Sequence, residues 1–131
     1  MLHGAISGLW RVRLYAATAS LNFQHFTTPY CLVGHTHSPV IFSQALNGGL
    51  ADERKPSPGE RIQLEGARRI VNPGSVGQPR DGNPDAAYAL LDFEAEVWDY
   101  KRVPYDVAAT QFRMAGWSLP ERLIARLPLG W

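Results

Sequence analysis

The sequence has one cysteine, no long hydrophobic run and almost no net charge, and each shortage excludes a class of protein. Cys31 stands alone, so an intrachain disulfide and a cysteine-rich zinc module are excluded. No apolar run reaches about 18 residues, and no charged N-terminal segment precedes an apolar one, so neither a membrane span nor a signal peptide is predicted. The 13 Lys and Arg residues face 12 Asp and Glu residues, which leaves no positive field for nucleic acid or a membrane surface. We expect a cytoplasmic protein.

The length and hydropathy indicate a folded domain. Apolar residues make up 45% of the 131 positions, which is ordinary for a globular protein and too high for a disordered chain. A chain of this length can form one compact domain with its own core and does not need two. We therefore expect residues 1–131 to form a single domain.

The apolar periodicity predicts helices at both ends and strands between them. Apolar positions from Leu9 to Phe26 recur at spacings of three and four, which favours a helix over about 9–23. His25, at its end, is interpreted as structural. Asp106 suits the N-cap of a later helix, and Pro120 suits the first turn of another. The expected C-terminal helices are 107–115 and 119–127.

The strands expected between these helices are 30–34, 39–43, 61–64, 69–71, 87–92 and 96–103. The segment 44–60 has the composition of a loop. Because no helices separate the strands after Val40, a parallel doubly wound sheet is disfavoured. The expected fold class is mixed α/β with mostly antiparallel strands.

The most informative motif is Gly34-His35-Thr36-His37, which directly follows a short apolar strand. Residues i and i+2 of an extended segment project to the same side, so both imidazoles could reach one metal ion. Gly34 lacks a Cβ and would let the chain turn sharply there. A His-x-His pair also occurs by chance, so the motif alone leaves a metal site and an ordinary loop open.

A second informative segment is the run of turn formers between Asn72 and Asp85. Such a loop at a strand end shapes a site or a partner surface, although a plain surface connection is the alternative. Arg80 and the turn amides would suit an anion, but no helix N-terminus follows closely. The candidate substrate or loop residues are Asn72, Gly74, Ser75 and Arg80.

Three segments in this order resemble the C-terminal half of a calcineurin-like metallophosphoesterase, of the small bacterial or diadenosine-tetraphosphatase-like type. The segments are His3-Gly4, Gly34-His35-Thr36-His37 and Asn72-Pro73-Gly74-Ser75-Val76-Gly77, followed by Ala87-Tyr88-Ala89-Leu90-Leu91-Asp92 and Leu119-Pro120-Glu121-Arg122-Leu123. The resemblance covers nearly the whole chain. It implies the second half of a four-layer αββα sandwich with mostly antiparallel strands and terminal helices.

The resemblance also implies a metal site and an activity. In the family, two divalent ions (Mn, Fe, Zn or Ni) activate water to hydrolyse a phosphomonoester or phosphodiester in a small molecule or nucleotide. Carried over residue by residue, His3 and His35 would bind the second ion and His37 the first. Two ions about 3.5–4 Å apart can stabilise both the entering and the leaving oxygen of an in-line displacement.

Other motifs of the family are missing from this sequence. Asp-x-His, Gly-Asp-x-x-Asp and Gly-Asn-His-Asp or -Glu supply the remaining ligands, the bridging aspartate and the histidine at the leaving group. Three neutral imidazoles without a carboxylate cannot offset the repulsion of two dications, so we expect at most one weakly held ion. No catalytic residue is assigned. The absent half would leave apolar surface or strand edges exposed, which predicts self-association through the sheet.

Two other interpretations stay open. The chain could be a non-catalytic binding or assembly module that retains the sheet and a partial metal site. A single structural zinc held by His3, His35, His37 and Cys31 is also conceivable, but a cysteine inside an apolar strand more often packs as a small hydrophobe.

Overall fold

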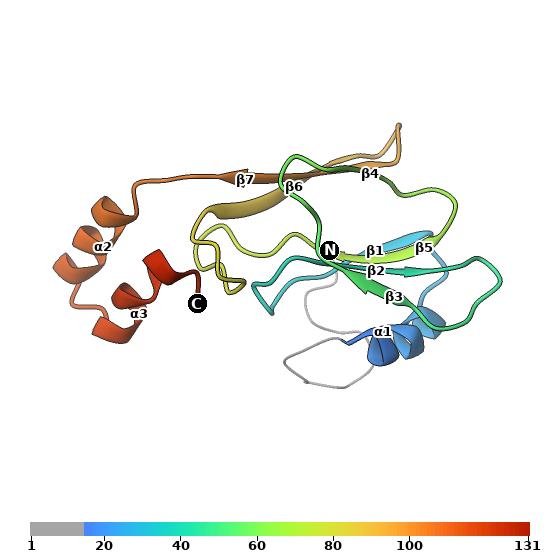
Figure 1. Cartoon of the computed structure of the whole chain (residues 1–131), viewed down its shortest axis with the longest axis horizontal. Helices are drawn as coiled ribbons and strands as arrows, with labels where there is room; N and C mark the ends of the chain where they lie inside the picture. The colour runs from blue at the N-terminus through green and yellow to red at the C-terminus, as the bar shows by residue number, and fades with distance from the viewer. Residues whose placement is uncertain (1–14) are drawn as a thin grey trace.

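The structure, a computed structural model, describes residues 15–131 (Figure 1). The elements in chain order are α1 (Ala16–Asn22), η1 (Phe23–His25), β1 (Tyr30–Leu32), β2 (Val40–Gln44), β3 (Asp52–Arg54), β4 (Arg61–Gln63), β5 (Arg68–Asn72), β6 (Ala86–Asp92), β7 (Val97–Val103), α2 (Val107–Gly116), α3 (Glu121–Ala125) and η2 (Leu127–Leu129). The predicted strands therefore exist, with boundaries that differ by one or two residues.

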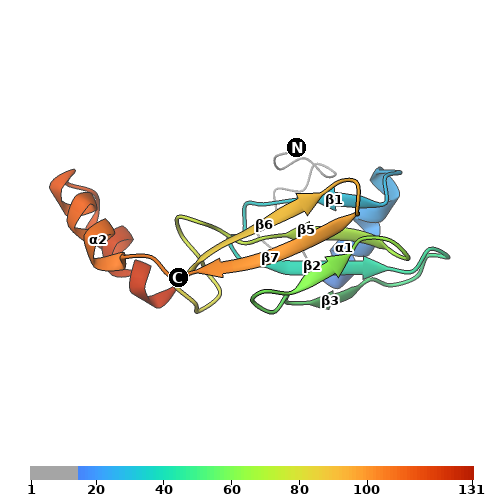
Figure 2. The ribbon, with the colours of Figure 1, turned by 90° about the horizontal axis from the view of Figure 1, so that it is seen from above.

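The strands form two sheets that face each other (Figure 1 and Figure 2). One sheet has the order β1-β5-β2-β3 and the other the order β4-β7-β6. Among the described strands, β1 and β5 form the parallel pair, and the remaining pairs are antiparallel. The expectation of a mixed α/β fold with mostly antiparallel strands is confirmed.

Alternation along β7 builds the core between the two sheets. Trp98 and Tyr100 point inward, with ring centroids 5.6 Å apart in a stacked arrangement. Residues of both sheets surround these rings; the buried members of this core are Ile41, Ile62, Leu64, Val71, Ala87, Trp98 and Tyr100. The inter-sheet core thus joins β7 to the sheet that carries the histidine motif.

Helix α1 covers the other face of the four-stranded sheet (Figure 1). Ala19 and Phe23 of this N-terminal region pack on Cys31, Phe42 and Ile70. Burial raises the pKa of the Cys31 thiol, which fits a cysteine that packs as a small hydrophobe. Within residues 15–131, no helix lies over the outer face of the three-stranded sheet.

Two predicted elements need correction. The predicted helix 9–23 is not continuous, because Tyr15 is extended and α1 begins at Ala16; positions before 15 lie outside the described residues. The segment 44–60 is not wholly irregular, because it contains β3, which pairs with β2. All three residues of β3 are exposed, so the sequence shows no apolar alternation there.

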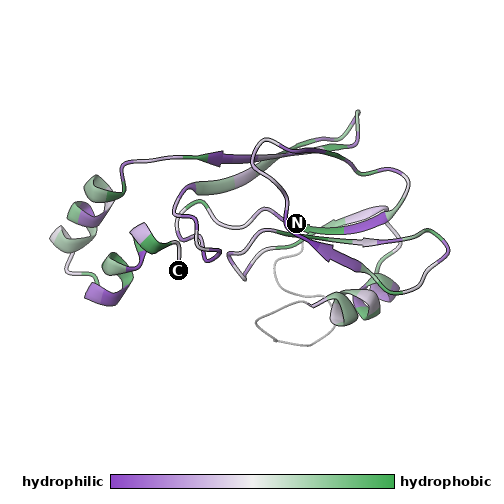
Figure 3. Cartoon of the chain, viewed as in Figure 1, coloured by the Kyte–Doolittle hydropathy of each residue, from purple (hydrophilic) through white to green (hydrophobic). Residues whose placement is uncertain are grey.

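The C-terminal helices form an arm that projects from the two sheets (Figure 2). As predicted, Asp106 caps α2 by accepting a hydrogen bond of 2.8 Å from the Ala109 N–H. Helix α2 has no buried residue, and Phe112 and Trp117 are more than 80% exposed. Figure 3 shows apolar residues along both helices. Within residues 15–131, no helix combines the length and apolar character that a membrane crossing requires.

Candidate metal site

Two loops leave the four-stranded sheet at the same end. The histidine loop (residues 33–39) follows β1, and the turn-rich loop (residues 73–85) follows β5. Because β1 and β5 are parallel neighbours, with Leu32 opposite Val71, both loops begin at the same end of the sheet, where these two strands finish. The Val33 N–H continues this pairing with a hydrogen bond of 2.9 Å to the Val71 carbonyl. The two motifs that the sequence analysis singled out are therefore neighbours.

The histidine loop is not the extended segment that was predicted. Strand β1 ends at Leu32, and His35 and His37 both have positive φ, at 80° and 60°. Gly34 does not have positive φ, so the sharp turn predicted for the glycine is made by the histidines. Positive φ is uncommon for residues other than glycine, although histidine is among those enriched there. The two histidines are therefore not positions i and i+2 of an extended segment, and the predicted common projection of their imidazoles has no extended backbone behind it.

Asn72 joins the two loops from a buried position. Its side-chain amide donates to the Gly34 carbonyl at 3.3 Å and to the Thr36 hydroxyl at 3.0 Å. Its Oδ1 accepts from the Gly74 N–H at 2.9 Å. Asn72 is only 1% exposed, and its hydrogen bonds are partly shielded from water. The asparagine thereby joins the start of the histidine motif, at Gly34 and Thr36, to Gly74 of the turn-rich loop.

The imidazole of His37 is oriented by the turn-rich loop. Its Nδ1 lies 2.9 Å from the Gln78 carbonyl oxygen. A carbonyl can only accept, so Nδ1 carries the proton and the neutral ring has its free lone pair on Nε2. Metal-binding imidazoles are held in this way, with the second nitrogen donating to a carbonyl or carboxylate. His37 therefore has the tautomer and support that a metal ligand needs.

His35 differs from His37 in its surroundings. It is exposed, and no hydrogen-bond partner of its ring lies within residues 15–131. Its imidazole is thus free to meet a ligand from solvent. His3, the third predicted ligand, lies outside the described residues.

The remaining candidate residues lie along the turn-rich loop. Gly74 has a φ of +88°, and a Cβ there would lie 3.1 Å from the Ala87 Cβ. The Ser75 hydroxyl accepts from the Gln78 N–H at 3.0 Å, which stabilises the turn that presents the Gln78 carbonyl. Arg80 is exposed and bonds the Gln78 side chain at 3.0 Å. Gly74 and Ser75 shape the loop, and the exposed Arg80 guanidinium is the part accessible to an anion from solvent.

Comparison with known proteins places this arrangement in a family. The model of the calcineurin-like phosphoesterase superfamily domain matches residues 1–96. The chain belongs to the calcineurin-like phosphoesterase superfamily. The match includes both loops and ends before the C-terminal arm.

The chain is also similar to individual proteins, two of them of known structure. A metallophosphoesterase from Sphaerobacter thermophilus, known from a crystal structure, superposes with a TM-score of 0.80 at 43% identity, over 88% of this chain and 48% of that chain. A hypothetical protein from Pyrococcus horikoshii shares the fold at a TM-score of 0.58 and 24% identity, over 89% of this chain and 37% of that chain. An uncharacterized protein of Methanocaldococcus jannaschii is 37% identical over 98 residues, which cover 75% of this chain and 38% of the relative. The chain thus spans less than half of the length of these relatives.

The described residues offer imidazole donors but no complete set of metal ligands. Imidazole nitrogen binds Zn, Mn, Fe and Ni, and His37 offers one such nitrogen with its tautomer set. Within residues 15–131, no three histidine, cysteine or acidic side chains are grouped closely enough to hold a metal ion. The described residues therefore account for part of a ligand set.

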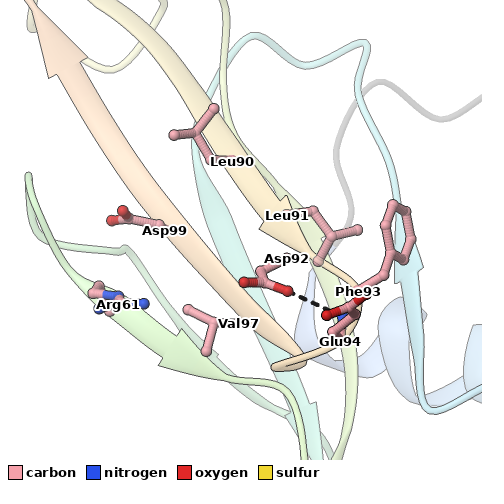
Figure 4. A pocket seen from close by; sticks show the side chains of 8 residues that line it. All are labelled: Arg61, Leu90, Leu91, Asp92, Phe93, Glu94, Val97 and Asp99. Atoms are coloured by element: carbon pink, nitrogen blue, oxygen red, sulfur yellow. Dashed lines mark hydrogen bonds between the residues drawn. The ribbon is translucent and has the colours of Figure 1, made fainter.

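A shallow hollow of about 570 Å³ lies elsewhere on the chain, on the outer face of the three-stranded sheet (Figure 4). Leu90, Phe93 and Val97 contribute apolar surface, and Asp92, Glu94 and Asp99 line it with carboxylates. It sits at the turn between β6 and β7, whereas the turn-rich loop precedes β6 at the strand's other end. The hollow is separate from the candidate metal site.

Sequence reasoning missed the main support of that site. The contact that orients His37 comes from the backbone carbonyl of Gln78, and every residue type has such a carbonyl. The run of turn formers indicated a shaped loop, which was the only feature of the sequence that pointed to it.

Proposed function

We propose that this chain supplies the C-terminal metal-binding loops of a metal-dependent phosphoesterase site. The substrate would be a phosphomonoester or phosphodiester in a small molecule or nucleotide. The observation that carries the proposal is the hydrogen bond from the His37 Nδ1–H to the Gln78 carbonyl, which leaves Nε2 for a metal ion. Membership of the phosphoesterase superfamily supports it.

The residues would divide the work as follows. His37 and His35 would bind a divalent ion, with His3 as a further ligand, and the exposed Arg80 would attract the phosphate. A bound divalent ion acts as a Lewis acid toward a phosphoryl oxygen and makes water a nucleophile near neutral pH. Asn72 would keep the histidine loop in place through its buried hydrogen bonds.

Charge balance limits what the chain does alone. Two dications held by neutral imidazoles repel each other, and a bridging carboxylate normally offsets that repulsion. We therefore expect one weakly held ion, and little or no turnover, from the isolated chain. The carboxylate ligands would come from protein outside the described residues.

Metal titration of the full chain tests this proposal. Calorimetry with Zn²⁺ and with Mn²⁺ should show binding that His37→Ala weakens at least about tenfold, since a ligand is lost. His25→Ala is the matched control, because this exposed histidine lies before β1, away from the histidine loop. Unchanged binding in His37→Ala, or an equal loss in His25→Ala, would reject the proposed site. Hydrolysis of bis(4-nitrophenyl) phosphate in added Mn²⁺, compared with His35→Ala, then measures any activity of the chain.

A second candidate function is that of an assembly module, and the sheet edge favours it. Among the described strands, β6 pairs only with β7; at its other edge the Ala87 N–H bonds the Ser75 carbonyl, and no described strand pairs with the rest of this seven-residue strand. An open edge of this length is a template for pairing with another chain.

Light scattering tests this self-association. We expect an average mass that exceeds the monomer mass and rises with protein concentration. A monomer mass at every concentration would reject it.

A further inference from the structure

A buried arginine on β7 holds the turn-rich loop. Arg102 lies on the inward face of β7, two residues beyond Tyr100, and its side chain is only 4% exposed. Its guanidinium pairs with the Asp81 carboxylate, which is 9% exposed. It also donates to the Asp85 carbonyl at 2.8 Å and to the Asn83 carbonyl at 3.2 Å. One side chain thus bonds three positions of the loop.

The Arg102 and Asp81 side chains meet away from water, and this burial raises the free-energy cost of losing either partner. Breaking a buried ion pair by removing one partner leaves an uncompensated charge and is strongly destabilising. The planar guanidinium can serve a carboxylate and two carbonyls at once, which a lysine ammonium cannot match in geometry. The position of residues 81–85 of the turn-rich loop therefore depends on Arg102.

Gly130, in the C-terminal tail that follows η2, also contacts residues 82 and 83 of the turn-rich loop. The Gly82 N–H donates to the Gly130 carbonyl at 3.1 Å. Gly130 has a φ of +67°, and a Cβ there would lie 2.6 Å from the Asn83 nitrogen. No other residue type fits this contact without moving the backbone. Figure 1 shows the C-terminus beside this loop.

Residues 78–80 of the turn-rich loop are hydrogen-bonded to His37 and to its neighbour Ser38. The Arg80 N–H donates to the His37 carbonyl at 3.0 Å, and the Ser38 hydroxyl donates to the Arg80 carbonyl at 3.1 Å. Gln78 accepts from the His37 ring. Arg80 directly precedes Asp81, so the residues bonded to Arg102 and those bonded to His37 are adjacent in the chain.

From this geometry we propose that Arg102 and Gly130 are positioning residues for His37. They hold the turn-rich loop so that the Gln78 carbonyl stays opposite Nδ1 and the lone pair stays on Nε2. Neither residue contacts the candidate metal position itself. The use of this positioning for metal binding rests on the proposed function, whereas the positioning itself is a property of the metal-free chain.

The test reads the imidazole tautomer directly. Long-range ¹H–¹⁵N spectra of the metal-free full chain distinguish Nδ1–H from Nε2–H, at about two pH units above the ordinary imidazole pKa of about 6.5. In the wild-type chain, His37 should be the Nδ1–H tautomer. In Arg102→Met it should become a mixture of both tautomers, and the affinity for Zn²⁺ should fall about 10–100-fold. Arg102→Lys should be intermediate, because the charge opposite Asp81 returns without the two carbonyl contacts.

Arg68→Met is the matched control for the loss of a supporting arginine. Arg68 bonds the Phe26 carbonyl and lies over the Phe26 ring, with its Cζ 4.8 Å from the ring centroid, on the face covered by α1. The Arg68→Met substitution should lower the free energy of unfolding without changing the His37 tautomer. A pure Nδ1–H tautomer in folded Arg102→Met, or the same change in Arg68→Met, would overturn the proposal.

Gly130→Ala keeps the test decisive if Arg102→Met does not fold. The added methyl group should push the tail from Asn83 and change the His37 tautomer in the same direction. Gly116→Ala is its control, because a Cβ there meets nothing within 4 Å. An unchanged tautomer in Gly130→Ala would overturn the role of the tail. A wild-type chain that binds no zinc but shows these tautomer changes would reject the proposed function and leave the positioning standing.

Discussion

Trp98→Ala should lower the free energy of unfolding by about 3–5 kcal/mol, the usual cost of removing a buried tryptophan. Trp98 is 2% exposed, stacks on Tyr100 and lies between the two sheets. Because one or two kcal/mol is already a large part of the stability of a domain, we expect the variant to unfold at a much lower urea concentration than the wild-type chain. Urea denaturation followed by circular dichroism measures the change.

The chain contains a matched control for this substitution. Trp117 follows α2 in the C-terminal arm and is 83% exposed. Trp117→Ala should change the free energy of unfolding by less than about 0.5 kcal/mol. Equal losses for the two tryptophans would contradict the assignment of the core to the inter-sheet space.

Asn72→Ala should lower the free energy of unfolding by about 2–4 kcal/mol, because three buried hydrogen bonds are lost. The Thr36 hydroxyl, the Gly34 carbonyl and the Gly74 N–H would each lose the partner that now joins the two loops. The affinity for Zn²⁺ should fall as well, since the histidine loop would no longer be held. Denaturation and calorimetry on the same preparation measure both effects.

Asn47→Ala is the control for this change. Asn47 lies in an exposed turn after β2, and its replacement should shift stability by less than about 0.5 kcal/mol. If Asn72→Ala reduced stability but left the zinc affinity at the wild-type value, the hydrogen bonds by which Asn72 joins the two loops would have no role in metal binding.

Most strands could be predicted because burial leaves a pattern in the sequence. Along β7, Trp98 and Tyr100 alternate with Asp99 and Lys101, and the structure buries the aromatic pair. Strand β3 could not be found this way, since all of its residues are exposed and its pairing with β2 is made by the backbone. The start of α1 was misplaced because the apolar spacing before Ala16 looks helical, while Tyr15 is extended.

The candidate site was only partly accessible from the sequence. The motif pointed to His35 and His37, and the turn formers pointed to the neighbouring loop. The geometry came from tertiary contacts that have no motif, namely the Gln78 carbonyl at His37 and the hydrogen bonds of Asn72. Arg102 was visible as a charged residue in the inward register of β7, but its partners in the turn-rich loop lie 17 to 21 positions away.

The central claim is that His37 offers Nε2 to a metal ion while Nδ1 stays bonded to Gln78. A zinc titration of the ¹⁵N-labelled full chain, followed through both ring nitrogens, tests it most directly. We expect the Nε2 resonance of His37 to move with zinc and Nδ1 to keep its proton. A resonance of Nε2 that stays in place at saturating zinc, or a metal-free ring protonated on Nε2, would contradict the account.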